Sequence, residues 1–170
     1  MLRALRDGTH PEILQLAPWF GRHPSPEGTA LLKRALRLGE PDDFGLALVL
    51  ARLGDHEVLA WGERRANAPT DHRWQGYYVL AHSTLPRADD SARRTIRGGK
   101  AKDVASLVDG YSDSGSPHRT ARLAAVIARR SDEPAVRDAL ARTLAHLAAS
   151  GAPDAALLRS AYRARRGLPP

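Results

Sequence analysis

The sequence predicts an all-α fold of stacked helix pairs, and three observations favour this class. Alanine and leucine are abundant while aromatic residues make up only 5% of the 170 residues; this mixture suits closely packed helices because Ala and Leu are strong helix formers. Few segments are rich in Val, Ile, Thr or aromatic residues, so strands are not expected. Apolar residues recur at helical spacing between Gly and Pro breaks, which divide the chain into about nine or ten helices.

One domain covering residues 1–170 is expected, because this length and a hydrophobic content of 42% are sufficient for a buried core. The chain contains no cysteine, which excludes disulfides, thiolate metal sites and cysteine nucleophiles. The N-terminus turns polar at once, and no window reaches the roughly 18 apolar residues that a membrane span requires. We therefore expect a cytoplasmic protein with no membrane partner.

The positive charge is confined to the second half of the chain. Residues 1–85 hold ten Arg and Lys against ten Asp and Glu, so this half is neutral. Residues 86–170 hold sixteen against nine and carry the whole net charge of +7. Such asymmetry is typical of a surface for an anionic partner. The alternative is that these arginines only decorate solvated helix faces.

Proline, glycine and capping residues delimit the first helices. A short helix is expected over residues 1–10, and a second starts at Pro11, since proline in a first turn loses no hydrogen bond. Ser25 should cap the third helix, and Gly39 should terminate it. Pro41, followed by two acids, starts the fourth.

The stretch Phe44–Ala66 is the centre of the predicted fold. Its first ten residues carry almost no charge and place apolar side chains on nearly every side of a helix, so this helix should be buried on most faces. Gly54-Asp55 forms a tight turn into a second, antiparallel helix, and a further helix covers residues 71–85. The side chains of the second helix expected to face water are Glu63, Arg64 and Arg65.

Five helices are expected in the basic half. The first two cover residues 89–97 and 100–111, and Pro117 starts the third. The strongest amphipathic pattern of the chain follows, between Val136 and Leu147, and a last helix precedes the tail. In the third of these helices, the residues expected to be buried are Leu123, Ala124, Ile127 and Ala128. In the last helix, they are Leu157, Leu158, Ala161 and Tyr162.

A phrase recurs where an acid precedes the start of a helix. The acids Asp55, Asp90 and Asp132 lie 35 and 42 residues apart, close to the period of helical-pair repeats. The phrase LARLGDHEV around Asp55 resembles the consensus of HEAT repeats, and IARRSDEPAV around Asp132 is a weaker match. This resemblance covers about half of the chain and implies a right-handed α-α superhelix that serves as a scaffold for protein partners. A helical bundle without repeats is the alternative.

The sequence contains no established catalytic or nucleotide-binding motif. The run Arg97-Gly98-Gly99-Lys100 could cradle a phosphate, but it lacks a strand-to-helix context, and an exposed turn is the favoured interpretation. No metal site and no cofactor are expected, because the histidines form no close pair of ligands. All seven histidines are expected at the surface or at helix caps: His10, His23, His56, His72, His82, His118 and His146.

An enzymatic alternative rests on Asp71, Trp74, Tyr77 and Tyr78. HEAT-like DNA glycosylases for alkylated bases combine a carboxylate and aromatic residues in a basic groove, and this set is similar in kind. No family motif matches residue by residue, so no catalytic residue is assigned. The aromatic residues are expected to pack in the core.

The candidate binding surface lies in the basic half. Solenoid stacking would bring successive helices onto one surface, where arginine binds phosphate oxygens bidentately. The first hypothesis is a non-enzymatic scaffold for a protein partner, the second is a nucleic-acid-binding module, and the third is the glycosylase. The candidate residues for nucleic acid or another anionic partner are Arg93, Arg94, Arg97, Lys100, Lys102, Arg119, Arg122, Arg129, Arg130, Arg159, Arg163 and Arg166.

Overall fold

The computed structural model describes residues 2–37 and 43–169, and every regular element within these ranges is a helix. The predicted all-α class is confirmed, with eleven helices in the described ranges, one more than the upper expectation. None of these helices is both long and apolar enough to cross a membrane. They are α1 (Leu2–Asp7), α2 (His10–Arg22), α3 (Pro26–Ala35), α4 (Phe44–Arg52), α5 (His56–Asn67), α6 (Arg73–His82), α7 (Pro86–Gly98), α8 (Ala101–Tyr111), α9 (Arg119–Arg130), α10 (Pro134–Ala149) and α11 (Ala155–Arg165).

The turn at Gly54-Asp55 has the predicted structure. Gly54 has a φ of +76°, a left-handed conformation that glycine adopts without a steric penalty. The Asp55 carboxylate then accepts hydrogen bonds from the backbone N–H groups of Glu57 and Val58, at 2.9 Å each. This cap satisfies two of the free donors at the start of α5, so α4 turns directly into α5.

The start of α3 also follows the sequence. Ser25 Oγ accepts a hydrogen bond of 3.1 Å from the backbone N–H of Gly28, and Pro26 occupies the first helical position. The expected cap at Gly39 and helix start at Pro41 lie outside the described residues.

Helix α7 starts one turn earlier than predicted. Pro86 stands at its first position, after Leu85 in an extended conformation. Proline fits this position because the N–H it lacks would have no partner there. Asp90 therefore lies within α7, and its expected place in a turn between helices is wrong.

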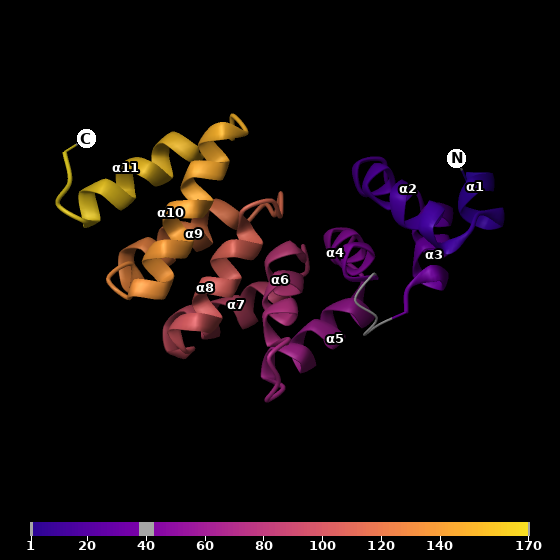
Figure 1. Cartoon of the computed structure of the whole chain (residues 1–170), viewed down its shortest axis with the longest axis horizontal. Coiled ribbons are helices and arrows are strands. Elements are labelled where there is room, and N and C mark those ends of the chain that lie inside the picture. The colour runs from indigo at the N-terminus through magenta and orange to yellow at the C-terminus, as the bar shows by residue number, and fades with distance from the viewer. Residues whose placement is uncertain (1, 38–42, 170) are drawn as a thin grey trace.

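The helices pack in two rows along the long axis of the molecule, with the termini at opposite ends (Figure 1). In one row α2, α4, α6, α8 and α10 contact one another in succession. In the other, α7 contacts α9 and α9 contacts α11. Helices consecutive in sequence connect the rows, so equivalent helices are two elements apart.

Ion pairs join equivalent helices at a nearly constant separation along the chain. Arg122 of α9 pairs with Asp89 of α7, 33 residues earlier, and Arg142 of α10 pairs with Asp109 of α8 at the same separation. Each helix pair is thereby joined to the next in a similar register. Three further pairs connect residues 30 to 35 apart, namely Arg73 with Asp103, Arg119 with Asp154, and Arg165 with Asp132.

Two apolar clusters form the core, and α5 and α6 contribute to both. As expected, α4 is buried on most of its faces, with Leu50 fully buried. Gly76 brings the backbones of α5 and α6 together, since a Cβ at this position would lie 2.3 Å from the backbone nitrogen of Ala66. The stretch Phe44–Ala66 thus lies at the junction of the two clusters.

The buried stripes of the last helices depart from the prediction. In α9 the buried apolar residues are Leu123, Val126 and Ile127, whereas Ala124 and Ala128 are exposed. In α11 Leu158 is buried, but Leu157 is 65% exposed. Helix α11 is the last described helix of its row and packs mainly on α9 and α10, so the side that carries Leu157 is left exposed.

Candidate functional site

Helix α7 carries four exposed arginines, Arg87, Arg93, Arg94 and Arg97, and has a concavity on each side. Arg93 and Arg97 point to the side of α9, while Arg94 lines the side of α5 and α6. The sequence Arg-Arg-x-x-Arg produces this division because neighbouring helical residues point about 100° apart, whereas residues i and i+4 share a face. The two concavities therefore divide the densest basic run of the chain.

The first concavity, here called the basic notch, is lined by Arg93, Ile96 and Arg97 of α7 and by Arg122, Ala125 and Arg129 of α9. Its volume is about 130 Å³. Four of its six lining residues are arginines, and all four belong to the predicted binding set. Buried Ile96 and half-buried Ala125 supply the apolar part of the lining.

Two of the four arginines in the basic notch are already paired. Arg122 is buried and donates to Asp89, and Arg93 donates to the same carboxylate at 2.9 Å. Arg97 and Arg129 are exposed, and no carboxylate of the described residues lies within 4 Å of either. The positive charge of the basic notch that remains free to bind is therefore on Arg97 and Arg129.

Other predicted binding residues stabilise the fold. Arg119 makes two hydrogen bonds to Asp154. Arg130 pairs with Glu133 and donates to the backbone carbonyls of Ile96 and Gly99. These guanidinium groups connect neighbouring helices.

The remaining predicted residues are dispersed. Lys100 and Lys102 are exposed at the start of α8, after the turn that ends α7. Arg159 and Arg166 are exposed at α11, where Arg163 donates to the backbone carbonyl of Pro169 at 2.5 Å. The structure brings together Arg93, Arg97, Arg122 and Arg129 in the basic notch, which the other predicted residues do not line.

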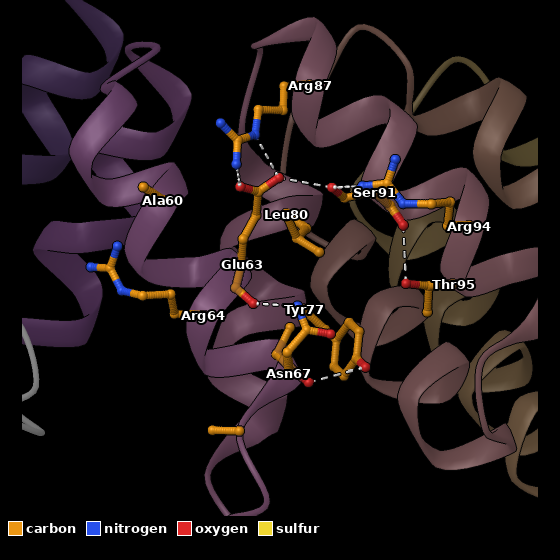
Figure 2. A pocket seen from close by; sticks show the side chains of 12 residues that line it. Ala60, Glu63, Arg64, Asn67, Tyr77, Leu80, Arg87, Ser91, Arg94 and Thr95 are labelled. Atoms are coloured by element: carbon orange, nitrogen blue, oxygen red, sulfur yellow. Dashed lines mark hydrogen bonds and ion pairs between the residues drawn. The ribbon is translucent and has the colours of Figure 1, made fainter.

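The second concavity, here called the polar cleft, opens between α5, α6 and α7 and has a volume of about 610 Å³ (Figure 2). Glu63 points across it from α5 to α7, where its carboxylate accepts hydrogen bonds from Arg87 at 3.0 Å and Ser91 at 2.9 Å. Arg94 donates to the same Ser91 hydroxyl at 2.8 Å. Glu63 was expected to face water, but its side chain is only 12% exposed. Its partners lie on the next helix pair, so no local pattern indicated its burial.

Tyr77 lines the wall of the polar cleft without offering a reactive group. Its hydroxyl donates to the backbone carbonyl of Ala66 and accepts from Arg73. Burial raises the pKa of Tyr77 above its ordinary value, although the hydrogen bond from Arg73 opposes this shift. The hydroxyl therefore stays protonated at neutral pH, and the Glu63 carboxylate is engaged by Arg87 and Ser91. The arrangement is suited to binding.

The aromatic residues of α6 point in different directions. Trp74 and Tyr78 pack against Phe44 of α4, with ring centroids 5.2 Å and 6.1 Å from it, whereas Tyr77 turns to the polar cleft. Trp74 is 38% exposed, so its expected place in the core is wrong. Asp71 is exposed ahead of α6. Of the four residues of the glycosylase hypothesis, Tyr77 lines the polar cleft and Tyr78 lines a different concavity beside Asp109 and Arg142.

His82 overturns the expectation that all histidines lie at the surface or at caps. It is fully buried at the end of α6, where its Nδ1 lies 2.9 Å from the carbonyl oxygen of Tyr78 and its Nε2 lies 3.4 Å from Asp113. The adjacent His82 ring is the main cause that lowers the pKa of Asp113 below its ordinary value. Its burial comes from the loop after α8 folding over α6, a contact that the local sequence does not encode.

No group of three or more His, Asp or Glu side chains in the described part of the chain could hold a metal ion. Comparisons with protein-family models, curated proteins and solved structures find no match. The functional assignment therefore depends on the geometry of α7 and its two concavities.

Proposed function

We propose that this chain is a non-enzymatic, HEAT-like scaffold, a right-handed α-α superhelix that binds an anionic protein partner along the outer side of α7 and α9. The fold part is supported by the two rows of helices and by the Arg–Asp pairs 30 to 35 residues apart. Repeats that contact their neighbours in one register build an extended surface suited to a partner chain.

The observation that carries the binding part is the charge state of the basic notch. Several arginines of the basic half are paired with carboxylates, including Arg119, Arg130 and Arg165. Arg97 and Arg129 remain exposed beside paired Arg93 and Arg122. A local cluster of this kind matches a short acidic segment of a protein, because each guanidinium can hold one carboxylate bidentately.

Nucleic acid is the second candidate, and the position of Lys100 and Lys102 favours it. These lysines follow Arg97 at the turn between α7 and α8, and they could extend the cationic surface along a phosphate backbone. The exposed aromatic ring of Trp74 lies on α6 against Phe44, so it offers no stacking surface next to Arg97 and Arg129.

A binding titration separates the two candidates. Fluorescence anisotropy is measured with a labelled acidic peptide of Asp and Glu in a Gly-Ser background, and with a random 20-base-pair DNA duplex. We expect the peptide to bind the protein more tightly than the duplex at about 150 mM salt, where backbone contacts to DNA are weakened. Tighter binding of the duplex at this salt would favour nucleic acid. Absence of binding to both probes at 50 mM salt would refute an anionic partner.

A further inference from the structure

The basic notch is built around a back wall that is already fixed. Arg122 is 8% exposed, and its guanidinium is held by Asp89, which also receives Arg93. Arg93 and Arg97 are four residues apart on α7, while Arg122 and Arg129 are seven apart, or two turns, on α9. An anion entering the basic notch therefore meets guanidinium groups from two helices, and those of Arg93 and Arg122 are ordered by Asp89 before it binds.

Carboxylates balance only part of this charge. Asp89 faces Arg93 and Arg122, and Asp90 lies 3.5 Å from Arg93 at the exposed edge. Arg97 and Arg129 have no carboxylate of the described chain within 4 Å. An occupant with a charge near −2 would neutralise these two guanidinium groups.

A phosphoryl group meets this requirement better than a single carboxylate. It carries a charge of about −1.5 to −2 at neutral pH and three acceptor oxygens, so it can bond Arg97 and Arg129 together. One carboxylate has two oxygens and one negative charge, which one guanidinium fork already satisfies.

The size of the basic notch indicates how that phosphoryl group is presented. A volume of about 130 Å³ is well below the roughly 300–1,000 Å³ of sites for drug-sized ligands. One tetrahedral group on a short side chain is appropriate for this space, whereas a nucleobase is not. The neighbouring guanidinium groups of Arg119 and Arg130 are engaged with Asp154 and Glu133, so they offer no row of further phosphate sites.

We propose that the basic notch receives the phosphoryl group of a phosphoserine or phosphothreonine in the partner protein, with Arg97 and Arg129 as its direct ligands. This inference rests on the proposed function, since it names the chemistry by which that partner is recognised. Phosphorylation of the partner then strengthens binding, because a phosphoryl group is a single group that bonds both arginines.

The test uses three degenerate peptide pools of the same acidic composition, whose fixed central residue is phosphoserine, serine or glutamate. Their anisotropy is titrated with the full chain and with Arg97→Gln, Arg129→Gln and Arg159→Gln variants. All three substituted arginines are exposed, and circular dichroism verifies that each variant is folded. The Arg159 variant is the matched control on α11.

We expect the phosphoserine pool to bind at least about ten-fold more tightly than the serine pool, with the glutamate pool close to serine. Arg97→Gln and Arg129→Gln should each abolish this ten-fold preference, while Arg159→Gln retains it. Equal binding of the phosphoserine and serine pools overturns the phosphoryl site but leaves the acidic-partner function standing. If none of the three pools binds, both the phosphoryl site and the acidic-partner function are overturned. Displacement of the bound phosphoserine pool by duplex DNA at equal phosphate concentration would assign the basic notch to nucleic acid instead.

Discussion

The guanidinium of Arg122 is joined to the carboxylate of Asp89 across the contact between α9 and α7, and the two side chains are only 10% and 11% exposed. The pair therefore holds two equivalent helices together and also forms the back wall of the basic notch. Removal of this ion pair should therefore reduce the free energy of unfolding more than it reduces binding.

Asp89→Asn is expected to destabilise the chain by about 3–5 kcal/mol, because it leaves the Arg122 guanidinium buried without a counter-charge. Urea denaturation followed by circular dichroism measures the change. The double variant Asp89→Leu/Arg122→Met should be more stable than the single variant, since a packed apolar pair replaces both charges. A single variant with unchanged stability would show that the pair does not hold α7 to α9.

Glycine at position 76 should be required for the contact between α5 and α6. A methyl group there would meet the backbone of Ala66 at 2.3 Å, so Gly76→Ala is expected to cost about 1–3 kcal/mol or more through overpacking. Gly45 is the matched control, because its added Cβ would meet no atom of another element within 4 Å among the described residues. Gly45→Ala should stabilise the chain by about 0.5–1 kcal/mol, owing to the better helix propensity of alanine. Destabilisation of equal size in both variants would contradict the packing described for α6.

Neighbouring leucines of α11 test which face of this helix is buried. Leu158 is 1% exposed and Leu157 is 65% exposed. Leu158→Ala should cost about 2–5 kcal/mol by opening a cavity, whereas Leu157→Ala should change stability by no more than about 0.5 kcal/mol. Differential scanning calorimetry of the two variants gives the comparison, and the reverse order would mean that α11 is rotated on its neighbours.

The same two leucines show what the sequence could predict. Helical periodicity indicated the all-α class and the amphipathic character of α10, because these depend on spacing along one segment. The sequence around Asp55 likewise predicted that its side chain caps the start of α5, because a cap depends on neighbouring residues only. The choice between Leu157 and Leu158 depends on which neighbours α11 meets, and this information is distributed over α9 and α10.

The candidate site was predictable only in its composition. All four arginines of the basic notch were among the predicted binding residues, yet nothing in the sequence separated Arg97 and Arg129 from Arg119 and Arg130. Arg119 is engaged by Asp154, 35 residues away, and Arg130 by backbone carbonyls at the end of α7 as well as by nearby Glu133. The buried pairings of Glu63 and His82 escaped prediction for the same reason.

The contact between His82 and Asp113 makes stability depend on pH. The His82 ring, 3.4 Å from the Asp113 carboxylate, lowers the pKa of Asp113 below its ordinary value, so the folded state favours the ionised carboxylate. This stabilisation is fully present above the unfolded-state pKa of about 3.9 and is lost as the pH falls through the lower folded-state pKa.

Asp113→Asn should therefore flatten the fall in urea midpoint between about pH 5 and pH 2. The control is Asp138→Asn, an exposed residue of α10 whose contact with Arg137 is 3.6 Å; it should leave the profile unchanged. If the urea midpoint of the Asp113 variant falls with pH as it does in the unmodified chain, the contact between His82 and Asp113 is excluded as a source of the pH dependence.

The affinity for the labelled acidic peptide, measured after charge reversal at each of two sites, tests most directly whether the partner binds at the basic notch. Both reversals change the net charge by the same amount. The proposed site is reversed in Arg97→Glu/Arg129→Glu, and the control is reversed in Arg159→Glu/Arg166→Glu, whose arginines are also exposed. We expect a loss of at least about ten-fold in affinity for the first variant and less than about three-fold for the second, at equal ionic strength. Equal losses in the two variants would contradict this expectation, because binding would then follow net charge and not the basic notch.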